Sequence, residues 1–141
     1  DGREVLEAVC EFCLSLPLAA RFANKVLLTH SLPSPNRMQW AGEEILERLI
    51  EPGDLSRGHP AYEWTWGRNQ TPEQVDQLAA DLDVEMFVLG HQYLPEGFGF
   101  IGDRAVVLAS DHERGHVLEF STAEPLTADR VRPGLRRIAA L

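Results

Sequence analysis

The chain has 141 residues, 44% of them apolar, and a formal net charge of −9, which suits one globular domain with a packed core. An acidic chain is a poor candidate for sequence-nonspecific nucleic-acid binding, because backbone phosphates are held by clustered Lys and Arg. No apolar run approaches the ~20 residues that span a bilayer and no charged leader opens the chain, so a soluble, cytoplasmic protein without a membrane partner is expected.

Apolar side chains recur at helical spacing near the start of the chain and predict a helix to about Leu14, which Pro17 ends. Cys10 and Cys13 form a C-x-x-C pair in this helix, a spacing found in redox pairs and in half of many zinc sites. No second C-x-x-C completes such a zinc site. The helical spacing therefore favours a simpler interpretation, in which both thiols lie on a buried face as small hydrophobic groups.

Two apolar runs each end in a histidine. KVLLTH at 25–30 predicts a strand over 25–29 that leads to His30, and VEMFVLGH at 84–91 predicts a strand over 84–89 that leads to His91. Open α/β folds bind ligands and metals at the carboxyl ends of such strands. Both imidazoles are therefore expected on one rim as candidate metal ligands. For any single one, the simpler alternative is a structural, hydrogen-bonded histidine.

Helices and a loop are predicted between these two runs. A proline-rich loop at 31–35 is followed by a predicted helix over 38–50, whose apolar face would contain Trp40, Ile45, Leu46, Leu49 and Ile50. Residues 54–69 lack periodicity and are rich in aromatic and hydrogen-bonding groups, which indicates a functional loop. A capping-box signal at 71–74 begins a further helix, which continues to about residue 82.

The second half of the chain has the pattern of short, mostly antiparallel strands. Strands are predicted over 98–101, 104–109 and 116–120, with a hairpin turn at Gly102. The final residues, 127–141, are expected to form a tail or a short helix that Pro133 and Gly134 break.

Three blocks of the sequence carry a resemblance to a known family. FCLSLPLAA at 12–20 precedes the run that ends in His30, LDVEMFVLGHQ at 82–92 contains His91 and precedes EGF at 96–98, and AVVLASDH occupies 105–112. In order and spacing these blocks resemble the calcineurin-like metallophosphoesterases, most closely the serine/threonine phosphoprotein phosphatases. The third block departs from the S-A-P-N-Y sequence of those phosphatases, and their aromatic lid residue has no clear counterpart here.

The resemblance implies a chemistry for the two histidines. His30 and His91 would be ligands to one of two divalent transition metals (Mn, Fe or Zn), which together activate a bridging hydroxide for in-line attack on a phosphate monoester. Arg68 would be the catalytic phosphate clamp, because a guanidinium fork can bind two phosphate oxygens. Matching Arg68 to the clamp of the family requires a short gap in the comparison.

Three further residues are candidates for the same site. Trp66 is expected to shape the substrate pocket, with core packing as the alternative for such a large aromatic side chain. Asp111 is expected to contact the substrate, and His112 to act as a catalytic group from the loop after the predicted strand 104–109.

The family's D-x-H, G-D-x-x-D and G-N-H-E motifs do not occur in this sequence. In the family they carry the remaining metal ligands and a leaving-group acid, so this chain alone is expected to bind no metal tightly. The resemblance implies that residues 1–126 are the carboxyl-terminal part of a metallophosphoesterase domain and that 127–141 are a tail. The expected fold is α/β, a mixed β-sheet with flanking helices that amounts to half of a four-layer α/β/β/α sandwich.

Three functions remain open at this point. The first is a metal-dependent phosphoesterase similar to a protein serine/threonine phosphatase, acting on a phosphorylated protein or a small phosphate ester. The second is a catalytically incomplete interaction module, which would self-associate or pair with the missing half through exposed apolar surface. The third is a nucleotide or small-molecule phosphoesterase of the same superfamily, which the altered loop at 110–112 permits.

Overall fold

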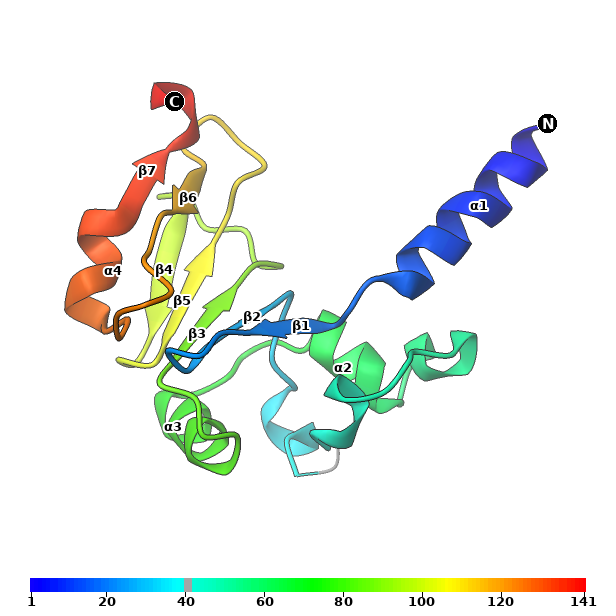
Figure 1. The fold of residues 1–141 in the computed structure, drawn as a ribbon, viewed down its shortest axis with the longest axis horizontal. Coiled ribbons are helices and arrows are strands. Elements are labelled where there is room, and N and C mark those ends of the chain that lie inside the picture. Colours follow the sequence, from blue (N-terminus) through cyan, green and yellow to red (C-terminus); the bar gives the residue numbers. More distant parts are fainter. Residues whose placement is uncertain (40–41) are drawn as a thin grey trace.

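A mixed β-sheet organises the described part of the chain, residues 1–39 and 42–141 of the computed structural model. Five strands of this part are ordered β1-β2-β3-β5-β4 (Figure 1). The three central strands run parallel, and a short antiparallel strand lies at each edge. The strands are β1 (Ala19–Arg21), β2 (Val26–Thr29), β3 (Met86–Leu89), β4 (Phe98–Ile101) and β5 (Ala105–Leu108). The predicted mixed α/β sheet is confirmed.

Strand β3 shows why the sheet is covered on both faces. All four of its residues are buried, and they alternate between two hydrophobic clusters, with Phe87 and Leu89 in one and Met86 and Val88 in the other. The first cluster is completed by α2 (Pro60–Trp66) and α3 (Pro72–Asp81), and the second by α4 (Ala128–Gly134), β6 (His116–Leu118) and β7 (Leu135–Arg137). The sheet is therefore the middle layer between helices and a small β-ribbon.

Helix α3 forms where the capping signal predicted it. Thr71 Oγ1 accepts a hydrogen bond from the Gln74 amide, and Gln74 Oε1 accepts one from the Thr71 amide. These two bonds satisfy donors that the first helical turn leaves free. The helix turns Val75, Leu78 and Ala79 into the core and leads directly to β3.

Two expectations for the segment between β2 and α3 are wrong. In the described part of the range 38–50, a short 3₁₀ turn at Glu44–Leu46 takes the place of the predicted helix, and further 3₁₀ turns lie on either side of the range, at Pro35–Arg37 and Pro52–Leu55. Trp40, which was expected on its apolar face, lies outside the described residues. The supposed loop at 54–69 contains α2, which buries Ala61 and Trp64.

The end of the chain also differs in part from expectation. The short helix expected within 127–141 forms as α4 and ends at Gly134, where a break was expected, but β7 then follows and pairs antiparallel with β6. Val131 of α4 is fully buried in the second cluster. Strands β1 and β7 were not predicted. Each has three residues, too few to show an alternating apolar pattern, and each forms because it pairs with a neighbouring strand.

Helix α1 (Gly2–Ser15) confirms the predicted helix but not its predicted burial. Asp1 and Glu4 form a capping box at its start, and none of its residues is buried. The helix projects away from the sheet and its flanking layers (Figure 1). Cys10 and Cys13 are free and exposed, so the expectation of a buried pair of thiols is wrong. The helical spacing was correct, but no other element of the described structure covers the apolar side of this helix.

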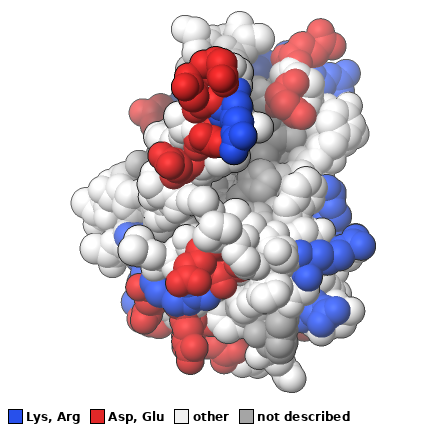
Figure 2. Space-filling view, turned by 90° about the vertical axis from the view of Figure 1, so that its right-hand side faces the viewer, with Lys and Arg blue, Asp and Glu red and all other residues white. Residues whose placement is uncertain are grey.

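Charged side chains of both signs are mixed on the face that α1 points towards (Figure 2). Among the described residues on that face, Lys and Arg do not gather into one broad basic area. None of the described helices has the length and apolar composition needed to cross a bilayer.

Candidate functional site

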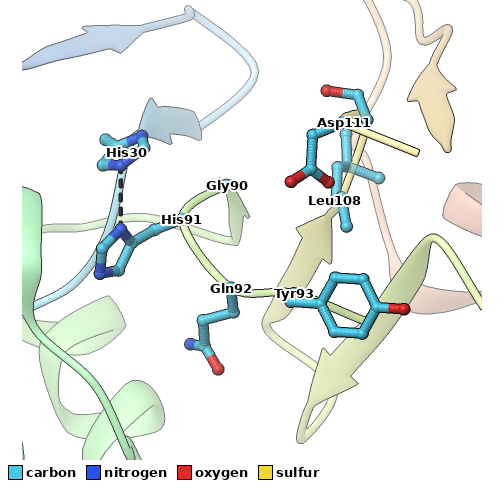
Figure 3. Close-up of a pocket in the computed structure, with 9 residues that line it drawn as sticks. His30, Gly90, His91, Gln92, Tyr93, Leu108 and Asp111 are labelled. Atoms are coloured by element: carbon cyan, nitrogen blue, oxygen red, sulfur yellow. Dashed lines mark hydrogen bonds between the residues drawn. The ribbon is translucent and has the colours of Figure 1, made fainter. Parts of the chain in front are cut away.

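A pocket opens at the carboxyl ends of the three parallel strands. Its volume is about 340 Å³, and it is lined by His30, Gly90, His91, Gln92, Tyr93, Leu108, Ala109, Ser110 and Asp111. These residues end or directly follow β2, β3 and β5. The two histidines lie on one side of the pocket, and Leu108 and Asp111 lie on the other (Figure 3). The pocket therefore forms where a ligand site was expected from the sequence, at the carboxyl edge of a parallel sheet.

His30 and His91 face each other across the ends of β2 and β3. His30 Nε2 lies 3.0 Å from His91 Nδ1, and the two ring centroids are 4.8 Å apart. The parallel register of the two strands, which pairs Thr29 with Leu89, brings the residues after them together. His91 has a φ of 68°, a left-handed conformation that is uncommon outside glycine and is often found at functional sites.

The spacing of these two nitrogens fits two ligands on one metal ion. With metal–nitrogen bonds of about 2.0–2.1 Å, two imidazoles at one ion have their ligating nitrogens roughly 3–3.4 Å apart. The observed 3.0 Å fits that range as well as it fits a hydrogen bond. Within residues 1–39 and 42–141, no group of three or more His, Cys, Asp or Glu side chains gathers to hold a metal. The pair thus fits part of a metal shell.

The surroundings of His91 favour its neutral form. Burial lowers the pKa of His91 from its ordinary value of 6.5, and the charges of Arg68 and His30 lower it further. Neutral imidazole is the form that binds a metal. The other ring nitrogen, His91 Nε2, is buried and has no hydrogen-bond partner in the described structure. His91 therefore retains an unused polar atom beside the pocket.

We predict that His91 in the metal-free chain titrates below 6.5, and that Arg68→Gln raises the pKa of His91 part of the way back. The recovery is partial because burial, the largest cause, remains. NMR of the imidazole nitrogens across the pH range, with EDTA present, would measure both values. Arg57→Gln, at another exposed arginine, is the matched control and should leave the pKa unchanged. A pKa of 6.5 or above for His91 in the unmodified chain would contradict the prediction.

A short network holds the end of α2 next to the two histidines. The Ser31 amide donates to Trp64 O at 3.1 Å, and Ser31 Oγ donates to Gly67 O. The Gln70 side chain donates to the carbonyl of Leu32. Because Ser31 directly follows His30, these bonds tie the chain after β2 to the chain after α2.

This network brings two of the predicted site residues to His91. The Trp66 ring meets the His91 ring edge-on at a centroid distance of 5.2 Å, and it also stacks on Tyr62. The Arg68 amide donates to Ser34 Oγ at 3.2 Å, and the Arg68 charge acts on His91. Trp66 and Arg68 are both exposed. The structure therefore brings His30, His91, Trp66 and Arg68 together.

The two candidates from the loop after β5 are placed differently. Asp111 lines the pocket, and its exposed carboxylate has no ion-pair partner among the described residues. His112 does not line the pocket. Its Nδ1 accepts from the Arg114 amide at 3.2 Å, so its Nε2 carries the proton and donates to Leu94 O at 3.0 Å. A catalytic role for His112 stays a prediction, and it would require these two bonds to break.

Sequence reasoning missed several residues that line the pocket. Gln92, Tyr93 and Ser110 were not among the predicted site residues, although they lie within two residues of His91 or of the end of β5. The rule that selected the histidines, that ligand sites form after parallel strands, could have found all three. Tyr93 is 68% exposed, and its ring tilts against His112 at 5.2 Å.

Comparisons with known proteins find a partial similarity to a solved structure. No protein family matches the chain, and no curated protein matches it. Among solved structures, the chain is similar to a protein serine/threonine phosphatase from Saccharomyces cerevisiae, which is described as similar to human phosphatase PP5. The identity is 17%, the TM-score is 0.48, and the match covers 68% of this chain and 35% of that one. The chain thus spans about a third of the yeast phosphatase.

Proposed function

We propose that this chain supplies part of the active site of a metal-dependent phosphoesterase, with His30 and His91 as two ligands of one divalent metal. The observation that carries the proposal is the 3.0 Å separation of His30 Nε2 and His91 Nδ1 at the ends of adjacent parallel strands. The resemblance of the surrounding sequence blocks to serine/threonine phosphoprotein phosphatases supports the same chemistry. Two ligands hold a metal weakly, so tight binding requires further ligands from outside the described residues.

Each residue of the site has a separate task in this proposal. His30 and His91 present neutral nitrogens, and burial keeps His91 neutral to a lower pH than an ordinary imidazole. Arg68 offers a guanidinium fork to the phosphoryl oxygens beside His91. Trp66 limits the freedom of the His91 ring by its edge-on contact. A bound divalent metal would supply Lewis acidity towards a phosphoryl oxygen and a lowered pKa for water.

The same residues favour one class of substrate. A phosphate monoester on a protein or on a small molecule fits a site with one guanidinium and a metal. Asp111 adds an unpaired negative charge on the wall opposite the histidines. A nucleotide with several phosphates would place further negative charge near this carboxylate, and the resulting repulsion would favour a monoester over a nucleotide.

Manganese titration of the chain with Cys10 and Cys13 replaced by Ser tests the metal pair without interference from thiols. Mn²⁺ is paramagnetic, so a bound ion should broaden the NMR signals of His30, His91 and Gly90 first. His30→Ala and His91→Ala should each abolish this local broadening, because a single imidazole remains. His59→Ala, at an exposed histidine away from the pocket, is the matched control and should leave the broadening intact.

A second titration tests the phosphate side of the site. With diamagnetic Zn²⁺ in place of Mn²⁺, inorganic phosphate should shift the guanidinium signal of Arg68, and Arg68→Lys should weaken the binding of phosphate because the bidentate fork is lost. Broadening that centres on carboxylates away from the pocket, or that survives in both histidine variants, would disprove the metal pair. Phosphate that binds equally well to the Arg68→Lys variant would disprove the clamp.

A second candidate function, an interaction module without catalysis, is favoured by α1. This helix has no buried residue and carries several exposed, large apolar side chains. Such a surface is typical of a binding face. Failure of both titrations above, together with association through α1, would favour this second candidate.

A further inference from the structure

A second pocket lies beside the candidate site and shares none of the residues that line it. Its volume is about 450 Å³, and it is lined by Glu96, Phe98, Arg114, His116 and Arg137. Glu96 comes three residues after Tyr93, and Arg114 comes three residues after Asp111. Both Tyr93 and Asp111 line the pocket of the candidate site. Because three residues span at most about 11 Å, the two pockets are neighbours on the loops that follow β3 and β5.

The pairing of β6 with β7 sets two of the lining side chains next to each other. His116 is the direct antiparallel partner of Arg137, and side chains that face one another in this way have Cβ atoms about 4.5–5.5 Å apart. The His116 ring also meets the ring of Phe98 in β4 edge-on, at a centroid distance of 5.1 Å. One face of the ribbon thus offers a guanidinium and an imidazole beside an aromatic ring.

Backbone contacts hold the walls of this second pocket together. Gly97 O accepts a hydrogen bond from the Ala109 amide at 2.9 Å, and Ala109 O accepts one from the His116 amide at 3.2 Å. A Cβ on Gly97 would lie 2.0 Å from Arg114 O, so the loops before β4 and before β6 meet at the level of the backbone. The lining residues therefore stand on segments that are tied to one another.

The second pocket has more positive charge than its own carboxylate can pair. Arg114 Nη1 lies 3.1 Å from Glu96 Oε1, and this ion pair uses the only carboxylate among the lining residues. Arg137 is exposed and makes no ion pair with any described residue. The second pocket thus presents an unpaired guanidinium, although the chain as a whole has a formal net charge of −9.

His116 adds a hydrogen-bond donor to this guanidinium. Its Nδ1 is buried without a hydrogen-bond partner in the described structure, and it packs so closely on Gly97 that a Cβ there would lie 2.5 Å away. A proton on Nδ1 would be a buried donor without an acceptor, which is costly, so Nε2 is expected to carry the proton. Nε2 is not among the buried atoms and has no hydrogen bond to a described residue. It is therefore free to donate to a ligand.

We propose that the second pocket binds a carboxylate with an apolar stem, which Arg137 holds by its guanidinium and His116 by its Nε2–H group. Two N–H groups of a guanidinium match the two oxygens of a carboxylate. Phe98 offers apolar surface to the stem. A single negative charge balances the unpaired guanidinium, whereas a phosphate dianion would bring additional charge close to Glu96. The inference requires no metal and does not depend on the proposed function.

Titration of the EDTA-treated chain with 3-phenylpropionate at low salt tests this inference. The acid should bind with a Kd of about 1 mM or below, and it should shift the NMR signals of the Arg137 guanidinium and the His116 ring. The uncharged 3-phenylpropanamide should bind at least about tenfold more weakly, because it lacks the charge that the guanidinium recognises. A capped peptide with a single Glu should bind if the natural ligand is an acidic side chain, and only the free acid should bind if it is a small molecule.

Two variants of the second pocket should change the affinity in opposite directions. Arg137→Gln should weaken the binding of 3-phenylpropionate about tenfold or more, because the guanidinium is lost. Glu96→Gln should strengthen it about threefold, because a like charge disappears and Arg114 is released. Arg136→Gln is the matched control. Arg136 precedes Arg137 on β7, so its side chain lies on the other face of the ribbon, 3.7 Å from Glu119, and the affinity should stay unchanged.

Four results would overturn the proposal. Equal binding of the acid and the amide would show that charge is not recognised, and an unchanged affinity in Arg137→Gln would remove the guanidinium from the site. NMR shifts centred on His30 and His91 would place the acid in the pocket of the candidate site instead. Inorganic phosphate that binds more tightly than the acid would overturn the assignment to a carboxylate.

Discussion

Replacing Gly67 by Ala is expected to lower the free energy of unfolding by about 3 kcal/mol or more. A Cβ at this position would lie 1.9 Å from Leu32 O and 2.7 Å from Glu63 O. Both neighbours are backbone atoms, which cannot rotate away as a side chain can. Gly67 has a φ of −61°, a conformation that Ala adopts without strain. The cost is therefore steric, and urea denaturation followed by circular dichroism would measure it.

The steric conflict lies in the contact that positions the candidate site. To make room for a methyl group, the chain after α2 must move away from the chain after β2, which breaks the bonds from Ser31 to Trp64 O and Gly67 O. Gly53→Ala is the matched control, since a Cβ there would meet nothing within 4 Å. Its free energy of unfolding should stay within about 0.5 kcal/mol of the unmodified chain. Equal stability of the two variants would show that α2 is not held as described.

Local signals in the sequence predicted the elements that frame the pocket. The capping box of Thr71 and Gln74 lies within four residues, and it begins α3 where expected. The apolar runs before His30 and His91 became β2 and β3, although β3 begins at Met86, two residues later than predicted. Buried parallel strands are apolar along their whole length, so this signal is strong. The expectation that the two imidazoles lie on one rim followed from this strand signal.

The predicted helix over 38–50 shows how a correct spacing can mislead. Gly42 has a φ of 48° and Leu49 is 86% exposed, while Ile45 is buried. A left-handed residue interrupts a helix, and glycine adopts that conformation easily. The helical spacing of the apolar residues in this segment therefore did not place them on one buried helix face.

Helix α2 had signals that were overlooked. Pro60 occupies the first turn, where proline suits a helix. Tyr62 and Trp66 are four residues apart and stack at a centroid distance of 6.2 Å. The exposure of α1, by contrast, could not be predicted, because a capping box and an apolar stripe specify a helix without specifying what packs against it. The unused nitrogen of His91 likewise depends on packing that only the three-dimensional structure reveals.

Replacing Trp64 by Ala is expected to lower the free energy of unfolding by about 3–5 kcal/mol. Trp64 is 1% exposed and belongs to the hydrophobic cluster that joins α2 and α3 to the sheet. Its Nε1 also donates to Gly42 O at 3.3 Å, which ties the segment before α2 to the core. Ala would leave a cavity of almost the whole indole and would free that carbonyl. Thermal and urea unfolding would measure the loss.

Trp66, two residues later on the same helix, is the matched control. It is 55% exposed, so Trp66→Ala should change the free energy of unfolding by less than about 1 kcal/mol. The same variant removes the ring that meets His91 edge-on at 5.2 Å, so it should still shift the NMR signals of the His91 ring.

The two tryptophans thus divide the work of α2 between stability and the candidate site. Trp64 packs in the core and holds the helix against the sheet, and Trp66, on the same helix, contacts the ring of His91. A Trp66→Ala variant that unfolds as easily as Trp64→Ala would contradict this division. An unshifted His91 in a folded Trp66→Ala variant would contradict the contact on which the second role depends.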